Sequence, residues 1–286
     1  MSSFLAYLVS GIALGCTFAL VASGFVMIHR VTGVVNFAQG TFAVVGGMAA
    51  AQLLGDGLPH GVAEAVALVA AGALGLLIGV IAIGKPGTPP LTSVIITLGL
   101  AIGAYAAEVV IFGDQPLSFT MADGAADFLG AHVQWQRFVI IGVTVVSYAV
   151  LALFFGRTYV GKALTACSSN PYAARLSGID PTRMGLLAFT IGGLLGGLAG
   201  ILITPVQPLS FDSDALLAVN GFAAAVFGGL MRPWTALLGA LVLGVSESMV
   251  GGYINASYEI EVALALMLAI MVWRSARTPA MAEEAV

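Results

Sequence analysis

Only the GRTYVGKA stretch at 156–163 has a spacing that suggests catalytic chemistry, because it matches the GxxxxGK pattern of phosphate-binding loops. In such loops a serine or threonine that helps to bind Mg²⁺ follows the lysine, whereas Ala163 stands there in this chain. The residues before the pattern form an apolar run instead of a strand. We therefore predict no nucleotide site on this chain. Because no nucleophile–base set or metal-ligand cluster is visible in the sequence either, we expect no enzymatic activity, no metal and no cofactor.

A second distinctive stretch, GVVNFAQG at 33–40, opens an otherwise apolar run. Its Asn36 and Gln39 carry amide side chains, and polar groups are costly where a helix faces lipid. The flanking glycines weaken a continuous helix. We expect these amides to face protein or a water-filled cavity. The run that they open, 34–54, is predicted to be either a full membrane crossing or a broken, re-entrant segment.

Other polar residues lie singly inside apolar runs. For Thr97, a hydroxyl that bonds back to a helix carbonyl is favoured over a pore-lining role. Asn220 stands beside Gly221 near the start of a segment, where it could line a cavity or cap a break. Glu108 and Glu247 fall towards the outer ends of their segments, and an acid within a membrane segment is a functional candidate. For Glu247, structural pairing and a pathway role agree equally well with the sequence.

The longest polar passage, GKALTACSSNPYAARLSGID, separates two groups of apolar runs at residues 161–180. Asn170 is a suitable N-cap, Pro171 fits the first helical position, and Gly178 can close a helix in the left-handed conformation. These residues predict a short helix over 171–177. Good helix formers just before it make the passage a predicted pair of capped helices.

Small apolar positions alternate with basic residues in this passage, which suits docking into a groove of a partner protein. An ordinary basic loop held near anionic lipid is the alternative. The apolar positions are Ala163, Ala166, Ala173, Ala174 and Leu176, and the basic ones are Lys162, Arg175 and Arg183.

Composition sets the elements that must position these residues. The chain has 286 residues, 59% hydrophobic and 8% charged, with a mean hydropathy of +1.04, whereas soluble domains carry about 25% charged residues. We predict an all-α polytopic membrane protein, a bundle of 8–9 transmembrane helices, with eight as the count if the second run does not cross. The apolar runs cover 4–28, 34–54, 62–83, 91–112, 137–156, 184–205, 215–231, 234–251 and 259–273.

The basic residues indicate the orientation. With nine crossings, Arg137 is the only one of the ten basic residues on the second face. Lys and Arg gather on the cytoplasmic side of membrane proteins, so we expect the N-terminus outside and the C-terminus in the cytoplasm. The residues on the first face are Arg30, Lys85, Arg157, Lys162, Arg175, Arg183, Arg232, Arg274 and Arg277.

Glycines recur at four-residue spacing in the run 184–205, at Gly192, Gly196 and Gly200. Such a smooth face lets helix backbones approach closely. We favour packing within this chain over a dimerisation face. Gly193 and Gly197 lie alongside, and weaker repeats of the pattern are Gly75 with Gly79 and Gly99 with Gly103.

The chain has two cysteines. Cys16 lies inside the first apolar run and Cys167 in the polar passage, so they are expected at different depths, too far apart for a disulfide. Both are predicted to be free thiols, which for Cys167 fits a reducing compartment.

The stretches at 33–40 and 161–180 resemble the two signatures of the branched-chain amino acid ABC importer permeases, and the chain is similar to the shorter of their two permease types. A third stretch, 221–248, resembles their late glycine-rich segment, although GGLMRPW departs from the usual glycine-rich turn. The resemblance implies a multi-pass protein of the bacterial inner (plasma) membrane. It also implies a single permease domain over 1–286, with a cytoplasmic coupling loop at 157–183.

The resemblance implies partners as well: a second related permease, two cytoplasmic ATPase subunits that hydrolyse ATP, and an external solute-binding protein, all assembled in or on the lipid bilayer. Residues implied near the solute pathway are Asn36, Phe37 and Gln39, to which the polar positions Thr97, Asn220 and Glu247 are added as candidates. Residues implied in ATPase coupling are Gly161, Ala163, Ala166, Asn170, Pro171, Ala173, Ala174, Arg175 and Gly178.

We therefore expect a permease subunit for a small neutral or zwitterionic solute, with branched-chain amino acids as the leading class. The alternatives are urea, amides, or other amino or aromatic acids. A channel or secondary carrier is disfavoured because no midplane acid is clear in the sequence. A non-transporting scaffold for a membrane complex is a further alternative. Nucleic acid is not an expected partner, since the basic residues are few and scattered.

Overall fold

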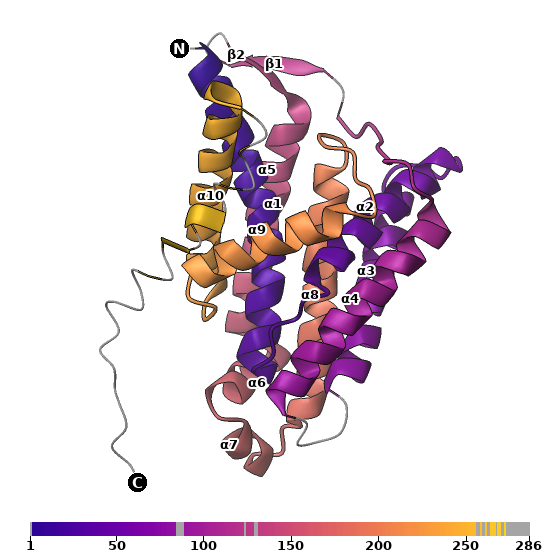
Figure 1. Ribbon diagram of the computed structural model, residues 1–286. Helices are drawn as coiled ribbons and strands as arrows, with labels where there is room; N and C mark the ends of the chain where they lie inside the picture. Colours follow the sequence, from indigo (N-terminus) through magenta and orange to yellow (C-terminus); the bar gives the residue numbers. More distant parts are fainter. Residues whose placement is uncertain are drawn as a thin grey trace.

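The computed structural model describes residues 2–83, 89–122, 124–128 and 131–255, together with isolated positions between 258 and 272. The described part of the chain is built of helices and one small β-hairpin (Figure 1), which confirms the predicted helical, polytopic fold class. The elements are α1 (Ser2–Thr32), α2 (Gln39–Gly55), α3 (Val62–Ile83), α4 (Pro90–Phe112), β1 (Ala125–Phe128), β2 (Ala131–Gln134), α5 (Trp135–Arg157), α6 (Tyr159–Ser169), α7 (Pro171–Leu176), α8 (Pro181–Ile203), α9 (Ser213–Phe227) and α10 (Pro233–Tyr253).

Six described helices are long and apolar enough to cross a membrane: α1, α3, α4, α5, α8 and α10. Helices α2 and α9 have 17 and 15 residues, so they are about 26 and 23 Å long, against about 30 Å of hydrocarbon. The expected eight to nine full-length helices are therefore not reproduced in the described residues, because the runs 34–54 and 215–231 form shorter helices. The run 259–273 lies mostly outside the described residues.

The two ends of the bundle carry different elements (Figure 1). Helices α6 and α7 lie at one end, and the hairpin of β1 and β2 lies at the other, beside the start of α1. The strands are antiparallel, with Ala125 opposite Gln134 and Phe128 opposite Ala131. The sequence analysis did not predict this hairpin, because two four-residue strands are too short to carry a clear alternating pattern.

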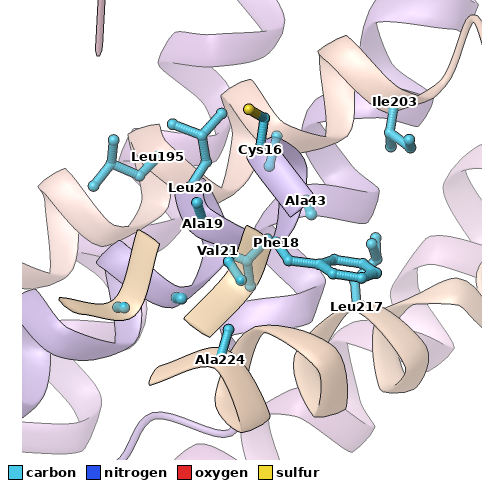
Figure 2. Close-up of a cluster of buried hydrophobic side chains, with 14 of the residues drawn as sticks. Cys16, Phe18, Ala19, Leu20, Val21, Ala43, Leu195, Ile203, Leu217 and Ala224 are labelled. Atoms are coloured by element: carbon cyan, nitrogen blue, oxygen red, sulfur yellow. The ribbon is translucent and has the colours of Figure 1, made fainter. Parts of the chain in front are cut away.

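Helix α1 is central and packs against α5, α8, α9 and α10. Its Ala19, Leu20, Val21 and Ala22 are fully enclosed. Close van der Waals packing of this kind holds membrane helices together, since lipid tails are as apolar as the side chains. Figure 2 shows the cluster, in which Cys16, Phe18, Ala19, Leu20 and Val21 meet Ala43 of α2, Leu195 and Ile203 of α8, and Leu217 and Ala224 of α9.

Glycine lets α8 pack directly on the backbones of α2 and α3. A Cβ atom on Gly200 would overlap the carbonyl oxygen of Ala43 in α2, and one on Gly193 would overlap that of Ala71 in α3. The glycine face of α8 therefore packs within the chain, as predicted. The two α4 glycines at which an added Cβ would meet no described atom within 4 Å are Gly99 and Gly103.

Candidate functional site

The turn between α1 and α2 interrupts the apolar run 34–54. Gly33 has a φ of +72°, which lets the chain leave α1, and its N–H donates to the carbonyl oxygen of His29 at 2.8 Å. Asn36 then orders the turn, since its Oδ1 accepts from the N–H of Ala38 at 3.2 Å. Helix resumes at Gln39. After this turn the run continues as one unbroken helix, and both amide side chains are buried in protein. The full crossing and the re-entrant segment both stay predictions.

Gln39 links the turn to the glycine-rich helix. Its Nε2 donates to the carbonyl oxygen of Gly192 at 2.9 Å, and its side chain occupies the space beside Gly24 and Gly196. Gln39 is completely buried, and its Oε1 has no partner among the described residues. The amide can therefore reach a solute only when α2, α1 and α8 separate.

Phe37 is the large side chain exposed in the turn, with 40% of its surface accessible. Its ring centroid lies 6.3 Å from that of Phe222 in α9, and its N–H donates to Oγ1 of Thr97 in α4 at 3.3 Å. The Thr97 hydroxyl itself donates to the carbonyl oxygen of Val94 at 2.9 Å, which confirms the predicted bond back to its own helix. The structure thus joins α2, α4 and α9 at Phe37.

The remaining candidates lie on α9 and α10. Asn220 is buried two positions before Phe222, and its Oδ1 has no partner among the described residues. Phe222 also contacts Phe25 of α1, with ring centroids 5.6 Å apart. Glu247 is buried on α10 and interacts with another group of the chain. The candidate pathway residues thus comprise a group around Phe37 and a position on α10.

Two acidic residues, one on α4 and one on α9, lie near each other. Glu108 is buried, its two carboxyl oxygens have no hydrogen-bond partner among the described residues, and it lies near enough to Asp214 of α9 to interact electrostatically. One turn earlier, Tyr105 packs edge-on against Phe211, with ring centroids 5.1 Å apart. Glu108 is not among the pathway residues predicted from the sequence. An acid within an apolar run was the available signal.

Side-chain caps shape the polar passage that leads from α5 to α8. Oδ1 of Asn170 accepts from the N–H groups of Tyr172 and Ala173, both at 3.0 Å, directly before α7. Gly178 has a φ of +82°, and the N–H after it returns to the carbonyl oxygen of Ala174 at 3.0 Å. The predicted helix over 171–177 is confirmed to within one residue.

Burial divides the candidate coupling residues into two groups. Gly161 and Ala174 are buried; Gly161 lies against the backbone of Phe154. Burial, with a smaller contribution from Asp180, raises the pKa of the nearby Cys167 thiol. Candidates that are partly or fully accessible are Ala163, Ala166, Asn170, Pro171, Ala173, Arg175 and Gly178.

Three large side chains project from the same two helices. Tyr159 is 90% exposed, Tyr172 72% and Leu176 74%. Tyr172 and Leu176 are four residues apart on α7 and so share a face. The sequence analysis included Leu176 among its contact positions but missed both tyrosines. Aromatic residues in a polar loop were the signal for them, because such side chains are enriched in protein interfaces.

The turn before α10 places a non-glycine residue in the left-handed backbone region, which usually favours glycine. Gly229 and Leu230 have φ values of +83° and +57°, and Leu230 is the only non-glycine residue with positive φ in the described chain. A leucine in this region costs roughly 1–2 kcal/mol. Oγ1 of Thr235 supports the turn by donating to the carbonyl oxygen of Gly228 at 2.7 Å.

Comparison with known proteins gives a consistent match over nearly the whole chain. The model of the family described as branched-chain amino acid transport system / permease component matches residues 7–273. The high-affinity branched-chain amino acid transport system permease protein LivH of Salmonella typhimurium is 27% identical, over 94% of this chain and 92% of that protein. The ribose import permease protein RbsC of Haemophilus influenzae is 25% identical, over 89% and 80%.

A solved structure shares the fold. PsaBC from Streptococcus pneumoniae, in complex with Fab, superimposes with a TM-score of 0.52 over 95% of this chain and 91% of that chain. The sequence identity is 16%, so this likeness concerns the fold alone.

Proposed function

This chain belongs to the branched-chain amino acid transport system permease family, and we propose that it is the transmembrane permease subunit of an ATP-driven ABC importer. Its solute is a small neutral or zwitterionic molecule, with branched-chain amino acids as the leading class. The observation that carries this proposal is the family match over residues 7–273, which includes both the Phe37 turn and the α6–α7 passage. The chain itself supplies a path through the membrane, and ATP is hydrolysed on partner subunits.

The proposed orientation places α6 and α7 in the cytoplasm and the start of α1 outside. Four basic residues lie at or next to α6 and α7: Arg30 at the end of α1, Arg157, Lys162 and Arg175. Arg137 instead follows the hairpin at the other end of the bundle. This distribution agrees with the positive-inside rule. With the six long helices, α2, α9 and the run 259–273 all counted as crossings, the proposed domain has nine membrane segments and a cytoplasmic C-terminus.

The proposed solute path passes the Phe37 turn. Phe37 is accessible there, and Asn36, Gln39 and Asn220 supply amide groups with unused hydrogen-bonding atoms. A small path-lining set of neutral amides and aromatic rings suits a zwitterion with an apolar side chain better than it suits an ion. Thr97 positions Phe37 through its backbone N–H. Glu247 is retained as a candidate on α10, where α1 and α9 pack.

Coupling to ATP hydrolysis is proposed to act through α7. The exposed face of Tyr172 and Leu176 is the contact surface for an ATPase, together with Asn170, Pro171 and Ala173 around the cap. Gly161 and Ala174 support this surface from inside. Only a short segment from Ser177 to Asp180 separates α7 from α8, so movement of α7 passes directly into the helix that holds Gln39.

The complete importer contains a second related permease, two ATPases and an external solute-binding protein. The site in the membrane then alternates between outward and inward exposure as the ATPases close and open. The alternative solutes are urea, amides, or other amino or aromatic acids. The match to a ribose import permease shows that similar proteins also include a permease named for a sugar.

Uptake by the complete complex in liposomes tests the function. We expect ATP-dependent leucine uptake that isoleucine and valine inhibit and ribose and urea do not. Failure of all three branched-chain amino acids to compete would remove that substrate class. Uptake by this subunit without the ATPases, down a solute gradient, would contradict the importer assignment itself.

A further inference from the structure

A cavity with two arginines opens at the α6–α7 end of the bundle. Its volume is about 330 Å³, within the range of small-ligand clefts, about 300–1,000 Å³. Arg30 enters it from the end of α1 and Arg232 from the turn before α10. Thr165 of α6 forms another part of its wall. The cavity therefore lies where three separate parts of the chain meet, and it is distinct from the Phe37 region.

The positive charge in this cavity has no counter-charge among the described lining residues. Arg30 and Arg232 are near enough to repel each other electrostatically, and none of the described lining residues is acidic. In the described part of the chain neither arginine forms an ion pair; Arg30 donates instead to the neutral Oγ of Ser168 at 3.3 Å. Two like charges in one partly enclosed site are stabilised by an external anion that accepts hydrogen bonds from both.

One wall of the same cavity is apolar and leads to the membrane. Leu151 and Phe155 of α5 line it, and the neighbouring α5 positions Val150 and Leu153 are exposed on the outside of the described bundle. Trp234, half exposed at the start of α10, also lines the cavity. Tryptophan is enriched at the level of lipid headgroups. A ligand with a charged head and an apolar tail matches this arrangement.

We propose that the cavity binds an anionic phospholipid, with its phosphate between Arg30 and Arg232 and an acyl chain along α5. In the proposed orientation this lipid belongs to the cytoplasmic leaflet, where basic pockets between helices bind cardiolipin-type headgroups. Because Arg30 also holds Ser168, the lipid fastens α6 to α1 and to the start of α10. The lipid thereby holds α6, the helix that directly precedes α7, in place.

The test titrates the purified complete importer in neutral detergent with cardiolipin, phosphatidylcholine or inorganic phosphate. Native mass spectrometry detects bound lipid, and thermal unfolding gives the melting temperature. Arg232→Gln is the main variant, because Arg232 lines the cavity and is exposed. Arg30→Gln is the second. Arg157→Gln is the matched control, since Arg157 is an exposed arginine at the same end that does not line the cavity.

We expect saturable binding of cardiolipin but not of phosphatidylcholine. Arg232→Gln and Arg30→Gln should each weaken it by about tenfold, the loss expected for one charge-assisted hydrogen bond, and Arg157→Gln should leave it unchanged. An equal loss of cardiolipin affinity in all three variants would mean that the lipid binds a general basic surface, and would overturn the proposed site. A melting-temperature rise with millimolar phosphate equal to that with cardiolipin would identify a free-anion site and overturn the lipid proposal.

Discussion

The side-chain amide of Gln39 and the carbonyl oxygen of Gly192 are 2.9 Å apart, and their hydrogen bond joins the first turn of α2 to the middle of α8. Both partners lie in the interior, where water does not compete for the bond. The same α8 begins just after α7, the proposed point of ATPase contact. The first residue of α2 is therefore hydrogen-bonded to the helix that follows the proposed ATPase contact.

Gln39→Met should keep the side-chain volume but remove the hydrogen bond. We expect the permease to lose about 0.5–1.5 kcal/mol of stability, as for a single hydrogen bond between membrane helices. Thermal unfolding of the purified complex measures this loss. Gln115→Met is the control, because Gln115 is exposed beyond α4. An unchanged melting temperature in Gln39→Met would mean that the bond contributes nothing to the packing of α2 on α8.

Gly200→Ala should disrupt the contact between α8 and α2. Its added Cβ would overlap the carbonyl oxygen of Ala43, so the helices must separate, at a cost of about 1–3 kcal/mol for an overpacked core. Gly103→Ala in α4 is the matched control, since no described atom lies within 4 Å of its Cβ. There the higher helix propensity of alanine should stabilise by about 0.5–1 kcal/mol. Yield and melting temperature of the two variants should therefore change in opposite directions.

Leu176→Asp should weaken ATPase binding without loss of the inserted subunit. Leu176 is exposed on α7, so a charge there costs little in the isolated chain but opposes an apolar contact with a partner. Co-purification of the ATPases measures the effect. Ala174→Asp is a less direct probe of the contact, because Ala174 is buried and its replacement disturbs α7 itself. Normal ATPase yield with Leu176→Asp would exclude this face of α7 from the contact.

The sequence predicted local structure well wherever a cap or a glycine determines it. Asn170, Pro171 and Gly178 defined α7 because their effects act within a few residues. The glycine spacing of α8 likewise identified a packing face, although not its partners. Which helices meet depends on contacts between residues far apart in the chain, and periodicity alone does not encode them. Gln39 and Gly192, 153 positions apart, illustrate that limit.

Helix length and exposure were less predictable from composition. Asn36 and Gln39 indicated a break in the second run, but hydropathy alone still counted it as a possible crossing. The exposure of Tyr159 and Tyr172 depends on how α6 and α7 sit against the rest of the bundle, which residue type alone does not determine. The acids Glu108 and Asp214 come from different helices, so their proximity required the fold.

Phe37→Ala should change transport without changing the amount of folded subunit. The ring is partly exposed and contacts Phe222 at 6.3 Å between centroids, a type of pair worth about 0.5–1.5 kcal/mol. A loss of this size leaves the subunit folded, and we expect uptake to fall by roughly two- to tenfold because a contact of similar energy between the ring and the solute is lost. Phe37→Tyr, which keeps the ring, is the control. Equal uptake by Phe37→Ala and the parent complex would remove Phe37 from the solute path.

The two native cysteines should react slowly with maleimides. Both are buried, and the raised pKa of Cys167 leaves less of the reactive thiolate at any given pH than an exposed thiol has. Labelling of Cys167 should therefore rise only at a pH above that at which an ordinary thiol begins to react. Fast labelling of the unmodified folded chain near neutral pH would contradict this burial.

Because the native cysteines are expected to react slowly, a single cysteine added at an exposed position can report the orientation of the chain in the membrane. We expect Tyr172→Cys to react with a membrane-impermeant maleimide only in inside-out vesicles, and Gln115→Cys only in right-side-out ones. Both positions are exposed; Tyr172 is on α7, and Gln115 is in the segment that leads from α4 to the hairpin at the opposite end of the bundle (Figure 1). The reverse labelling pattern would invert the proposed topology.

The late arrival of α8 has a consequence for biosynthesis. Helix α2 is short and buries most of its surface against α8, α3 and α9, and two of these helices follow it in the chain by more than a hundred residues. At about 5–20 residues per second, the ribosome needs roughly 10–30 s to deliver them. During that interval the amide of Gln39 has no Gly192 to bind. The nascent chain must therefore hold α2 in an incomplete state, exposed to membrane chaperones and proteases, until α8 enters the bilayer.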